Sequence, residues 1–252
     1  MTAGGGSWRV RVVVPARDEE ALLARCLTSV NRAAATLVSA RPGDDVSVTV
    51  VLDSCIDASA AVAAGLPGVD TVVVDHGSVG AARAAGVAHA TRADRSPDRV
   101  WVANTDADCE VPEEWLLSHL EHADRGHEVV VGLVEPSDAD LEPRLLAAWR
   151  SRHERRDGHG HVHGANLGFT LRAYRAAGGF PPVPAHEDVV LVERLRRSGV
   201  RWFCSGAASV LTSGRRNGRT PEGFAAYLRD LGHDVGPEPA PALDVAVIEP
   251  SA

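Results

Sequence analysis

The stretch VWVANTDADCEVPEEWL, residues 100–116, decides the class of fold. It runs from four mostly apolar residues into the carboxylates of Asp106, Asp108 and Glu110, and Pro112 then opens a segment with helical spacing. Three carboxylates within five residues repel one another unless water, a cation or a hydrogen-bond donor compensates their charge. The stretch is therefore a strand that ends either in an exposed acidic turn or in a ligand site.

Strands and helices alternate upstream of this stretch. Short β-branched segments predict strands at 8–14, 46–52 and 69–74. Apolar spacing predicts helices at 19–40, from about 57, and at 81–90. This alternation indicates a parallel sheet, in which ligands bind beyond the carboxyl ends of the strands. Because the charged clusters at 17–20, 53–57 and 106–110 each follow a strand, we expect them to meet at one rim.

The residues after Glu128 are expected to complete the sheet. Strands are predicted at 129–134, 200–203 and 208–212, and the segment 163–180 holds a further strand and a short helix ended by glycines. Further helices are predicted at 139–157, 187–198 and 221–232, with an Arg/Gly loop at 213–219. The Pro/Ala-rich end, 233–252, is expected to be a mobile tail.

Composition limits the partners and the compartment. The 252 residues are 44% hydrophobic and 24% charged, as in an ordinary soluble globular protein. A net charge of -8, with arginines spread among the acids, argues against a nucleic-acid partner. The sequence has no signal peptide and no apolar run long enough for an integral membrane segment, so we expect a cytoplasmic protein. Its four cysteines form no CxxC pair and are expected to stay reduced.

The spacing of Asp106 and Asp108 permits a metal site. A hard divalent cation such as Mg or Mn takes oxygen ligands and commonly uses one or two carboxylates together with substrate phosphates. Two carboxylates at i and i+2 on a turn can supply those oxygens. The alternative is a solvated acidic turn before the helix that Pro112 opens, and the spacing alone leaves both interpretations open.

Five blocks of sequence resemble one family, and they occur in its order from Val10 to about Arg219. PARDEEALLARCLTSV resembles the PxxNEExxLxxCLxSL opening of family 2 glycosyltransferases, VVVLDSCIDAS their VVDDxSxDxT element, and NTDADCEVPEEWL their DxD strand end. GANLGFTLRAYRAAGGF and HEDVVLVERLRRSGVRW are similar to their GxNxAxRRxAxxxxGGF and EDxxLxxRLxxxG blocks. The resemblance implies an α/β fold of the GT-A type: a Rossmann-like, mostly parallel sheet flanked by helices, with an acceptor-side second half.

The resemblance also assigns the donor side. One domain over 1–232 would have a nucleotide-binding half at about 8–135 and an acceptor half at about 136–232. Asp108 would coordinate a Mn or Mg ion that bridges the diphosphate, Asp106 would approach the ribose or the metal, and Arg83 would lie near the base or the phosphates. The nucleoside pocket would be lined by Pro15, Ala16, Arg17 and Glu19, and Asp53 would bind the base.

The acceptor side needs a base. Attack by an acceptor hydroxyl requires removal of its proton on the face opposite the leaving group, at a distance from the metal carboxylates. The resemblance places this base at Asp188, at the expected start of a helix, and implies inversion at the anomeric carbon. Glu187 and the arginines of the SGRRNGR loop are assigned to the acceptor or phosphate side; the arginines are Arg215, Arg216 and Arg219. The alternatives are acids that complement a helix dipole and a solvated basic loop.

Some positions depart from the family pattern. Asp18 stands where many members have Asn, Ser54 replaces the second acid of the frequent DDGS form, and Asp57 is interpreted as a helix cap. The stretch RSRHERRDGHGHVHGAN is unusual because it carries His159, His161 and His163 at alternate positions, which share one face of an extended chain. We interpret it as a substrate loop rather than a zinc or nickel site, because no nearby carboxylate or cysteine completes a metal set.

The sequence thus predicts metal-dependent, inverting transfer of a sugar from a nucleoside-diphosphate sugar to a hydroxyl acceptor, either a small molecule or a lipid. A nucleotidyltransferase is the alternative enzyme, although PARDEEA lacks the Gly-rich phosphate loop of that class. A regulatory protein that binds nucleotide sugars without turnover is the alternative outside enzymes. The nucleotide, the sugar and the acceptor are not fixed by these motifs.

Overall fold

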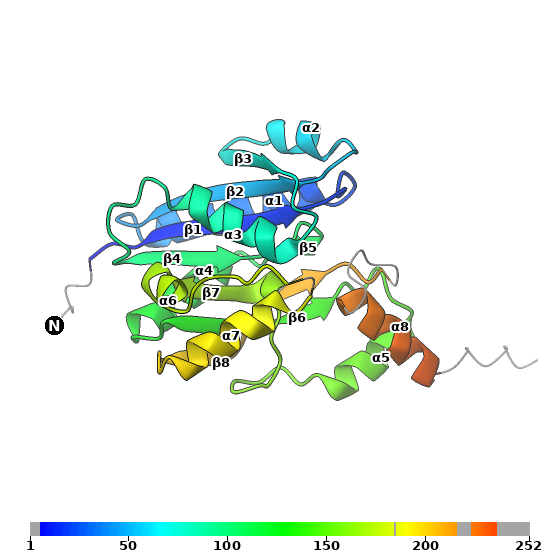
Figure 1. Cartoon of the computed structure of the whole chain (residues 1–252). Coiled ribbons are helices and arrows are strands. Elements are labelled where there is room, and N and C mark those ends of the chain that lie inside the picture. Colours follow the sequence, from blue (N-terminus) through cyan, green and yellow to red (C-terminus); the bar gives the residue numbers. More distant parts are fainter. Residues whose placement is uncertain (1–5, 184, 216–222, 236–252) are drawn as a thin grey trace, which may run out of the picture.

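An eight-stranded sheet forms the middle layer of the computed structural model, which describes residues 6–183, 185–215 and 223–235 (Figure 1). Its strands are β1 (Arg9–Ala16), β2 (Asp45–Asp53), β3 (Val69–Val74), β4 (Val100–Asn104), β5 (Cys109–Glu110), β6 (Val129–Pro136), β7 (Leu167–Thr170) and β8 (Trp202–Thr212). They lie side by side in the order β3-β2-β1-β4-β7-β6-β8-β5. Neighbours pair in parallel except at β7, which is antiparallel to β4 and β6, and at β5, which is antiparallel to β8. The mostly parallel sheet predicted from the sequence is confirmed.

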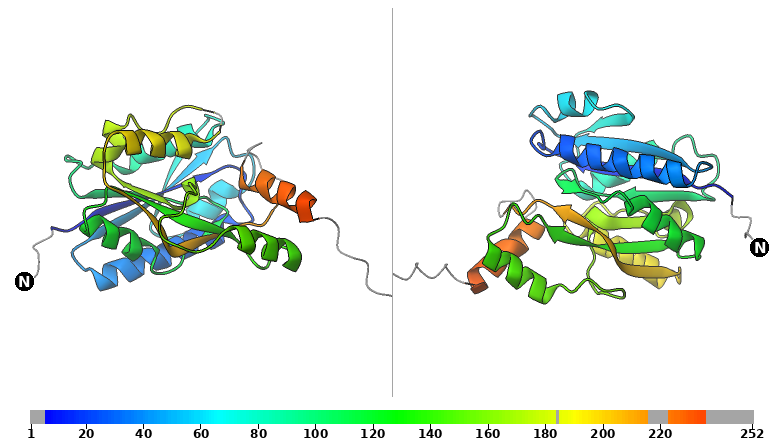
Figure 2. Two further views of the ribbon diagram at one scale, coloured as in Figure 1. Left: turned by 90° about the horizontal axis from the view of Figure 1, so that it is seen from below. Right: turned by 180° about the vertical axis from the view of Figure 1, so that it is seen from behind.

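Helices cover both faces of the sheet. On one face lie α1 (Leu23–Ala40), α2 (Ser59–Ala64) and α4 (Trp115–Asp124), which Figure 2 shows from behind. The other face carries α3 (Val79–Ala90), α6 (Leu171–Ala176) and α7 (Glu187–Arg197). A third apolar cluster joins α5 (Pro143–Arg152) to α8 (Phe224–Val235), side by side at one end of the sheet (Figure 1). The short helix η1 (Gly164–Asn166) precedes β7.

Strand β1 shows why the sheet sits between two helical layers. Its residues alternate between the two faces: Val10, Val12 and Val14 are fully buried in the cluster of α1 and α4, and Val13 is fully buried in the cluster of α3 and α7. Arg11 is a buried charged residue of this strand, and its guanidinium contacts Asp94 at 3.0 Å and Asp45 at 2.6 Å. A strand that is apolar on both faces fits only a central position in a covered sheet.

The strand order creates a crevice at the carboxyl edge of the sheet. The chain places β2 on one side of β1 and then crosses to place β4 on the other side, so the direction of winding reverses between β1 and β4. Ligands of open α/β sheets bind at such a reversal, beyond the carboxyl ends of the strands. The segments that leave these two strands begin with Arg17 and with Thr105, immediately before the acidic stretch.

Three segments differ from the sequence prediction. The helix expected at 139–157 is only α5, because Pro143 sets its first turn and the residues after Arg152 leave the helix to run along β8; there the Gly158 amide donates to the Cys204 carbonyl at 2.8 Å. The two short strands expected at 200–203 and 208–212 are one strand, β8, with an irregular register opposite Gly132 and Val134. The two-residue strand β5 was not expected.

Two further expectations concern the membrane and the cysteines. None of the described helices is both long enough and apolar enough to cross a membrane. Cys26, Cys55, Cys109 and Cys204 are all free thiols, as their spacing predicted. The expected tail beyond residue 235 lies outside the described residues.

Candidate active site

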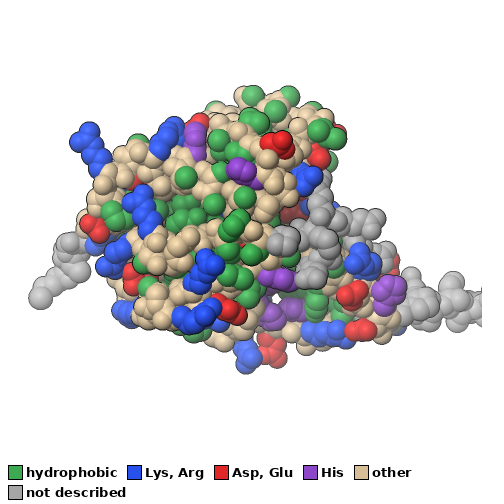
Figure 3. Space-filling view, viewed as in Figure 1, with side chains coloured by type: hydrophobic (Ala, Val, Ile, Leu, Met, Phe, Trp, Pro, Cys, Tyr) green, Lys and Arg blue, Asp and Glu red, His purple; other side chains and the backbone are tan. Residues whose placement is uncertain are grey.

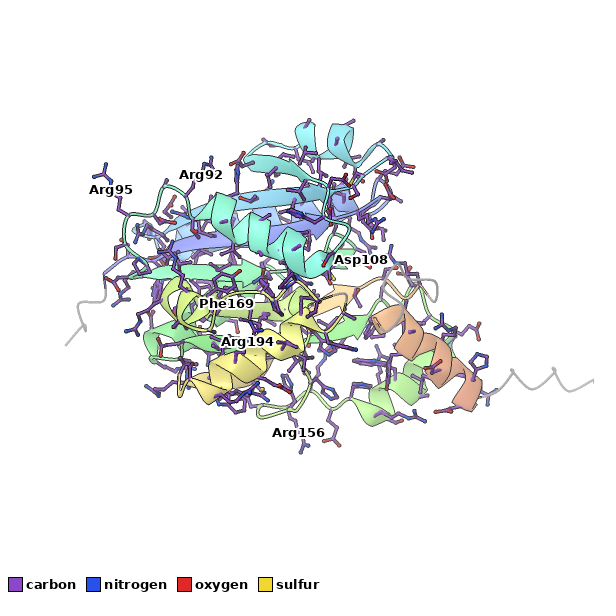
Figure 4. All side chains as sticks on the ribbon, viewed as in Figure 1. Arg92, Arg95, Asp108, Arg156, Phe169 and Arg194 are labelled. Carbon is purple, nitrogen blue, oxygen red and sulfur yellow. The ribbon has the colours of Figure 1, made fainter. Side chains whose placement is uncertain are left out.

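A cavity of about 810 Å³ opens at the carboxyl edge of the sheet. Its wall contains the ends of β1 and β2, the loop between β3 and α3, and the residues that follow β4. The start of α7, the loop before η1 and one side of α8 complete it. The expected site residues that line it are Pro15, Ala16, Arg17, Glu19, Asp53, Arg83, Asp106, Asp108, Glu187, Asp188 and Arg215. Figure 4 shows Asp108 at this end of the sheet, opposite the end that carries Arg92 and Arg95. Arg216 and Arg219 lie outside the described residues.

Asp53, the last residue of β2, organises the loop before α3. Its buried carboxylate accepts the backbone N–H groups of His76 at 2.7 Å, Gly77 at 2.9 Å and Ser78 at 3.0 Å. Burial on its own would raise the pKa of Asp53, but these amides and the Ser54 hydroxyl lower it below its ordinary value. Asp53 is therefore an anion whose position and charge are fixed by the backbone of the cavity wall.

The acidic pair after β4 faces an internal arginine. The Arg215 guanidinium contacts Asp108 at 2.9 Å and both carboxylate oxygens of Glu19, at 2.6 and 2.9 Å. Burial and the neighbouring charge of Asp106 raise the pKa of Asp108 to about 6, although Arg215 opposes this shift. The ligand atoms of Asp106, Asp108 and Cys109 lie within 4.8 Å of one another. Negative charge is thus concentrated here, and Arg215 partly compensates it on the side of Asp108.

Arg83 crosses the cavity wall from α3. Its side chain is only 3% exposed, and its guanidinium donates to Glu187 at the start of α7 and to Asp106 after β4. Burial would lower the pKa of Arg83, but attraction from Asp106, Glu187 and Asp188 raises it above the ordinary value. Arg83 therefore remains a cation that ties the start of α7 to the acidic stretch after β4.

Asp188 lies in the first turn of α7, opposite the loop before η1. One carboxylate oxygen accepts the Gly164 N–H at 2.6 Å and the other accepts the Val189 N–H at 2.8 Å. The preceding residue, His186, has a φ of 59°, a left-handed conformation that turns the chain abruptly into the helix. The carboxylate of Asp188 consequently has a fixed orientation at the cavity wall.

Sequence reasoning missed two residues of the wall and placed a third only in a general substrate loop. His163 is adjacent to the amide that holds Asp188, and Phe224 and Tyr227 line the cavity from α8. The alternate histidines were the available signal for the first, whereas the last two come from a helix with no motif. Asn166 of the GAN block also has an unexpected role, because its amide nitrogen donates to the Leu133 carbonyl at 2.8 Å and its oxygen accepts from the Trp115 indole at 2.9 Å.

The comparison with known families decides the assignment. The family model described as "Glycosyl transferase family 2" matches residues 11–177. The chain belongs to glycosyl transferase family 2. Among curated proteins, no sequence matches this one.

Solved structures share the fold of this family 2 chain at low sequence identity. TarS 1–349 of S. aureus in complex with UDP-GlcNAc is 13% identical, with a TM-score of 0.62 over 86% of this chain and 61% of that one. The mannosyltransferase PcManGT from Pyrobaculum calidifontis, in complex with GDP-Man and Mn²⁺, is 19% identical, with a TM-score of 0.59 over 84% and 59%. GalNAc-T7 with UDP, GalNAc and Mn²⁺ is 13% identical, with a TM-score of 0.59 over 85% and 46%. The chain spans about six tenths or less of the length of these three proteins. Their similarity to it confirms the expected GT-A fold.

Two departures from the family 2 pattern lie at left-handed backbone positions. Asp18 has a φ of 50°, which Asn and Asp adopt more readily than most residues do, whereas Ser54 has a φ of 55° and belongs to a residue type without that preference. The Asp18 carboxylate accepts the Ile56 N–H at 2.8 Å, and neither Asp18 nor Ser54 is among the residues that line the cavity. Asp57 accepts the N–H of Ser59, the first residue of α2, at 2.9 Å, which agrees with the expected capping role.

Proposed function

We propose that this chain transfers a sugar from a nucleoside-diphosphate sugar to a hydroxyl acceptor, with a divalent cation and with inversion at the anomeric carbon. One observation carries the proposal: a single cavity has the acidic pair Asp106 and Asp108 in one part of its wall and the oriented carboxylate of Asp188 in another. Such a transfer needs both sets, because charge develops on the leaving diphosphate while a proton leaves the acceptor. Membership of family 2 supports the reaction class.

The residues after β4 fit a hard divalent cation, Mn or Mg. The carboxylates of Asp106 and Asp108 offer oxygen atoms, which such ions prefer. Cys109 stays a neutral thiol, because burial raises its pKa well above the ordinary value, and its sulfur lies 3.5 Å from the Asp108 carboxylate. Burial and the negative charge of Asp106 raise the pKa of Asp108, and a bound cation would compensate that charge. When bound there, the cation would stabilise the charge on the leaving nucleoside diphosphate.

The chain's own residues divide the remaining tasks. Pro15, Ala16 and Arg17 at the end of β1, together with Asp53, form the wall for the nucleoside. Arg215 is within reach of the acidic pair and can hold the diphosphate once donor binds. UDP-GlcNAc in the TarS complex and GDP-Man in the PcManGT complex support a nucleotide-sugar donor for this chain as well.

Asp188 is the proposed base. Its carboxylate accepts two backbone N–H groups, which leaves further lone pairs on each oxygen for the hydroxyl proton of the acceptor. Arg83 holds the neighbouring Glu187 and so sets where α7 begins. Removal of the proton by a base opposite the leaving group produces inversion.

The first experiment is a calorimetric titration of uridine, guanosine and thymidine diphosphates, with and without Mn²⁺. We expect Mn²⁺-dependent binding of one nucleotide to the native chain and its loss in Asp108→Ala. The matched control is Asp138→Ala, which removes an exposed carboxylate that pairs with Arg150. Absence of binding for every nucleotide under both conditions would contradict the proposal.

The second experiment separates turnover from binding. We expect Asp188→Asn to keep its affinity for the donor while release of nucleoside diphosphate falls by about 10²- to 10⁴-fold, as for loss of a general base. A regulatory protein would show no release in the native chain either. A nucleotidyltransferase would instead release pyrophosphate from a nucleoside triphosphate and a sugar phosphate.

A further inference from the structure

The histidines of the loop before η1 form a row along the cavity. The rings of His159 and His161 are 5.9 Å apart and those of His161 and His163 are 6.1 Å apart, with interplanar angles of 28° and 13°. The common face expected from alternate positions therefore exists. His159 anchors the buried end of the row, since its ring nitrogen donates to the Ser205 carbonyl at 3.2 Å. His161 and His163 line the cavity.

Aromatic side chains extend this row on the side of α5 and α8. His153 stacks on Trp149 at 4.4 Å with an interplanar angle of 1°, and it also lies 4.8 Å from the ring of His161. Tyr227 meets His153 edge-on at 5.4 Å. The space-filling view in Figure 3 shows histidine side chains gathered beside a hollow near the α5–α8 pair. We call this wall, made of His153, His161, His163, Phe224 and Tyr227, the imidazole wall.

The imidazole wall does not have the geometry of a metal site. Within the described ranges, the groups of side chains close enough to share one ion are Asp18, Cys55 and Asp57, and Asp106, Asp108 and Cys109. Neither group contains a histidine. The rings stack with their planes nearly aligned instead of pointing their nitrogen atoms at one centre, so each ring offers a flat face and a polar edge.

Burial also favours the neutral form of two imidazoles of this wall. Burial lowers the pKa of His163 to about 4 even though Asp188 opposes this shift, and burial likewise lowers the pKa of His161. Arg152, which also lines the cavity, pairs with Asp234 at 3.3 Å. Neutral imidazoles do not attract a phosphate or a carboxylate as cations would. They favour a ligand without charge that combines apolar C–H faces with hydroxyl groups.

Position links the wall to the reaction. The amide that orients Asp188 belongs to Gly164, directly after His163, so a ligand that rests on the rings has a hydroxyl beside that carboxylate. A pyranose ring meets these conditions, because its C–H face packs on aromatic planes while its hydroxyls bond to ring nitrogens. We propose that the imidazole wall is the acceptor subsite and that it takes a neutral pyranose ring, free or as the headgroup of a glycolipid. This inference rests on the proposed function and names its acceptor.

Saturation-transfer NMR tests this subsite directly. The probes are methyl glycosides of glucose, galactose, mannose, xylose and N-acetylglucosamine, each compared with an anionic partner such as a sugar phosphate or a uronic acid. We expect a saturation-transfer signal for at least one neutral glycoside. Its dissociation constant should be at least tenfold higher in His161→Ala and in Tyr227→Ala. The matched control is His89→Ala, which removes an imidazole of α3 that pairs with Asp70 of β3.

The outcomes separate the source of the sugar and the two proposals. Equal binding of methyl and octyl glycosides indicates a free sugar or glycan, whereas tighter binding of the octyl form indicates a glycolipid. Three results would overturn the inference. The first is the absence of a saturation-transfer signal for every neutral glycoside, and the second is tighter binding of the anionic partners or of polyprenyl phosphate in vesicles. The third is unchanged binding of the glycosides in both variants. Titration of nucleoside diphosphates, measured on the same samples, reports on the proposed function independently.

Discussion

Arg215 is an internal competitor for the proposed cation site, and its replacement has a predictable effect. In the absence of donor, its guanidinium occupies the Asp108 carboxylate at 2.9 Å, so a cation bound to those oxygens must displace it. A hydrogen bond to a charged group contributes about 1.5–3 kcal/mol. In Arg215→Gln this contact no longer has to be broken, and Mn²⁺ should bind about ten- to a hundredfold more tightly without nucleotide.

The assay is calorimetric titration of Mn²⁺ into the chain without nucleotide. Arg150→Gln is the matched control, because that guanidinium pairs with the exposed Asp138 at 2.7 Å and lies outside the cavity wall. With Mn²⁺ at saturation, the same Arg215→Gln variant should bind nucleoside diphosphate more weakly, since it has lost a donor for the phosphates. Unchanged or weaker Mn²⁺ binding in Arg215→Gln would refute the competition.

Three further predictions concern stability. Arg83→Met should lower the free energy of unfolding by about 3–5 kcal/mol, because it leaves the buried Glu187 without its counter-charge, and denaturant unfolding beside the milder Arg83→Lys measures this. Gly132→Ala should lower the free energy of unfolding by about 1–3 kcal/mol, because a Cβ at this position overlaps the Asn166 amide. Gly160→Ala should leave it unchanged, because a Cβ there has no atom within 4 Å. Equal losses for the two variants in thermal unfolding would contradict the packing argument. Burial lowers the pKa of His119 to about 4, so between about pH 6.5 and pH 4 the unfolded chain binds a proton that the folded chain does not. The free energy of unfolding should therefore fall by about 3 kcal/mol from pH 6.5 to pH 4. Urea titrations at several pH values measure this loss, which should be smaller in His119→Gln.

The sequence predicted those parts of the fold that depend on local pattern. The β-branched runs ending at Pro15, Asp53 and Asn104 are buried strands, and the charged residues after them meet at one rim because parallel strands end at the same edge. The break between 203 and 208 was visible too, although it is an irregularity within β8 and not a gap between strands. Periodicity detects a change in pattern but not the pairing that bridges it.

The rest of the site depends on partners far apart in the chain. The sequence assigned Glu187 to the acceptor or phosphate side, but only the fold brings it against Arg83 on α3. Arg215 received the same assignment, and nothing in the sequence indicated its contact with Glu19 near the other end of the chain. An ion pair between distant segments produces no periodic pattern in the sequence, so the partner of a charged residue cannot be found from residue spacing. The acceptor-side wall from α8 was missed for the same reason, because Phe224 and Tyr227 belong to no motif.

The place of β7 has a consequence for synthesis on the ribosome. This strand lies between β4 and β6 in the sheet, although both of them precede it in the chain. In a nascent chain, the edges of β4 and β6 that face β7 therefore have no native neighbour until Leu167–Thr170 has been translated. This interval lasts on the order of several seconds at roughly 5–20 residues per second. Open edges of apolar strands pair readily with other chains. The yield of folded protein should consequently respond to translation speed across residues 104–170 and to chaperones that bind extended segments.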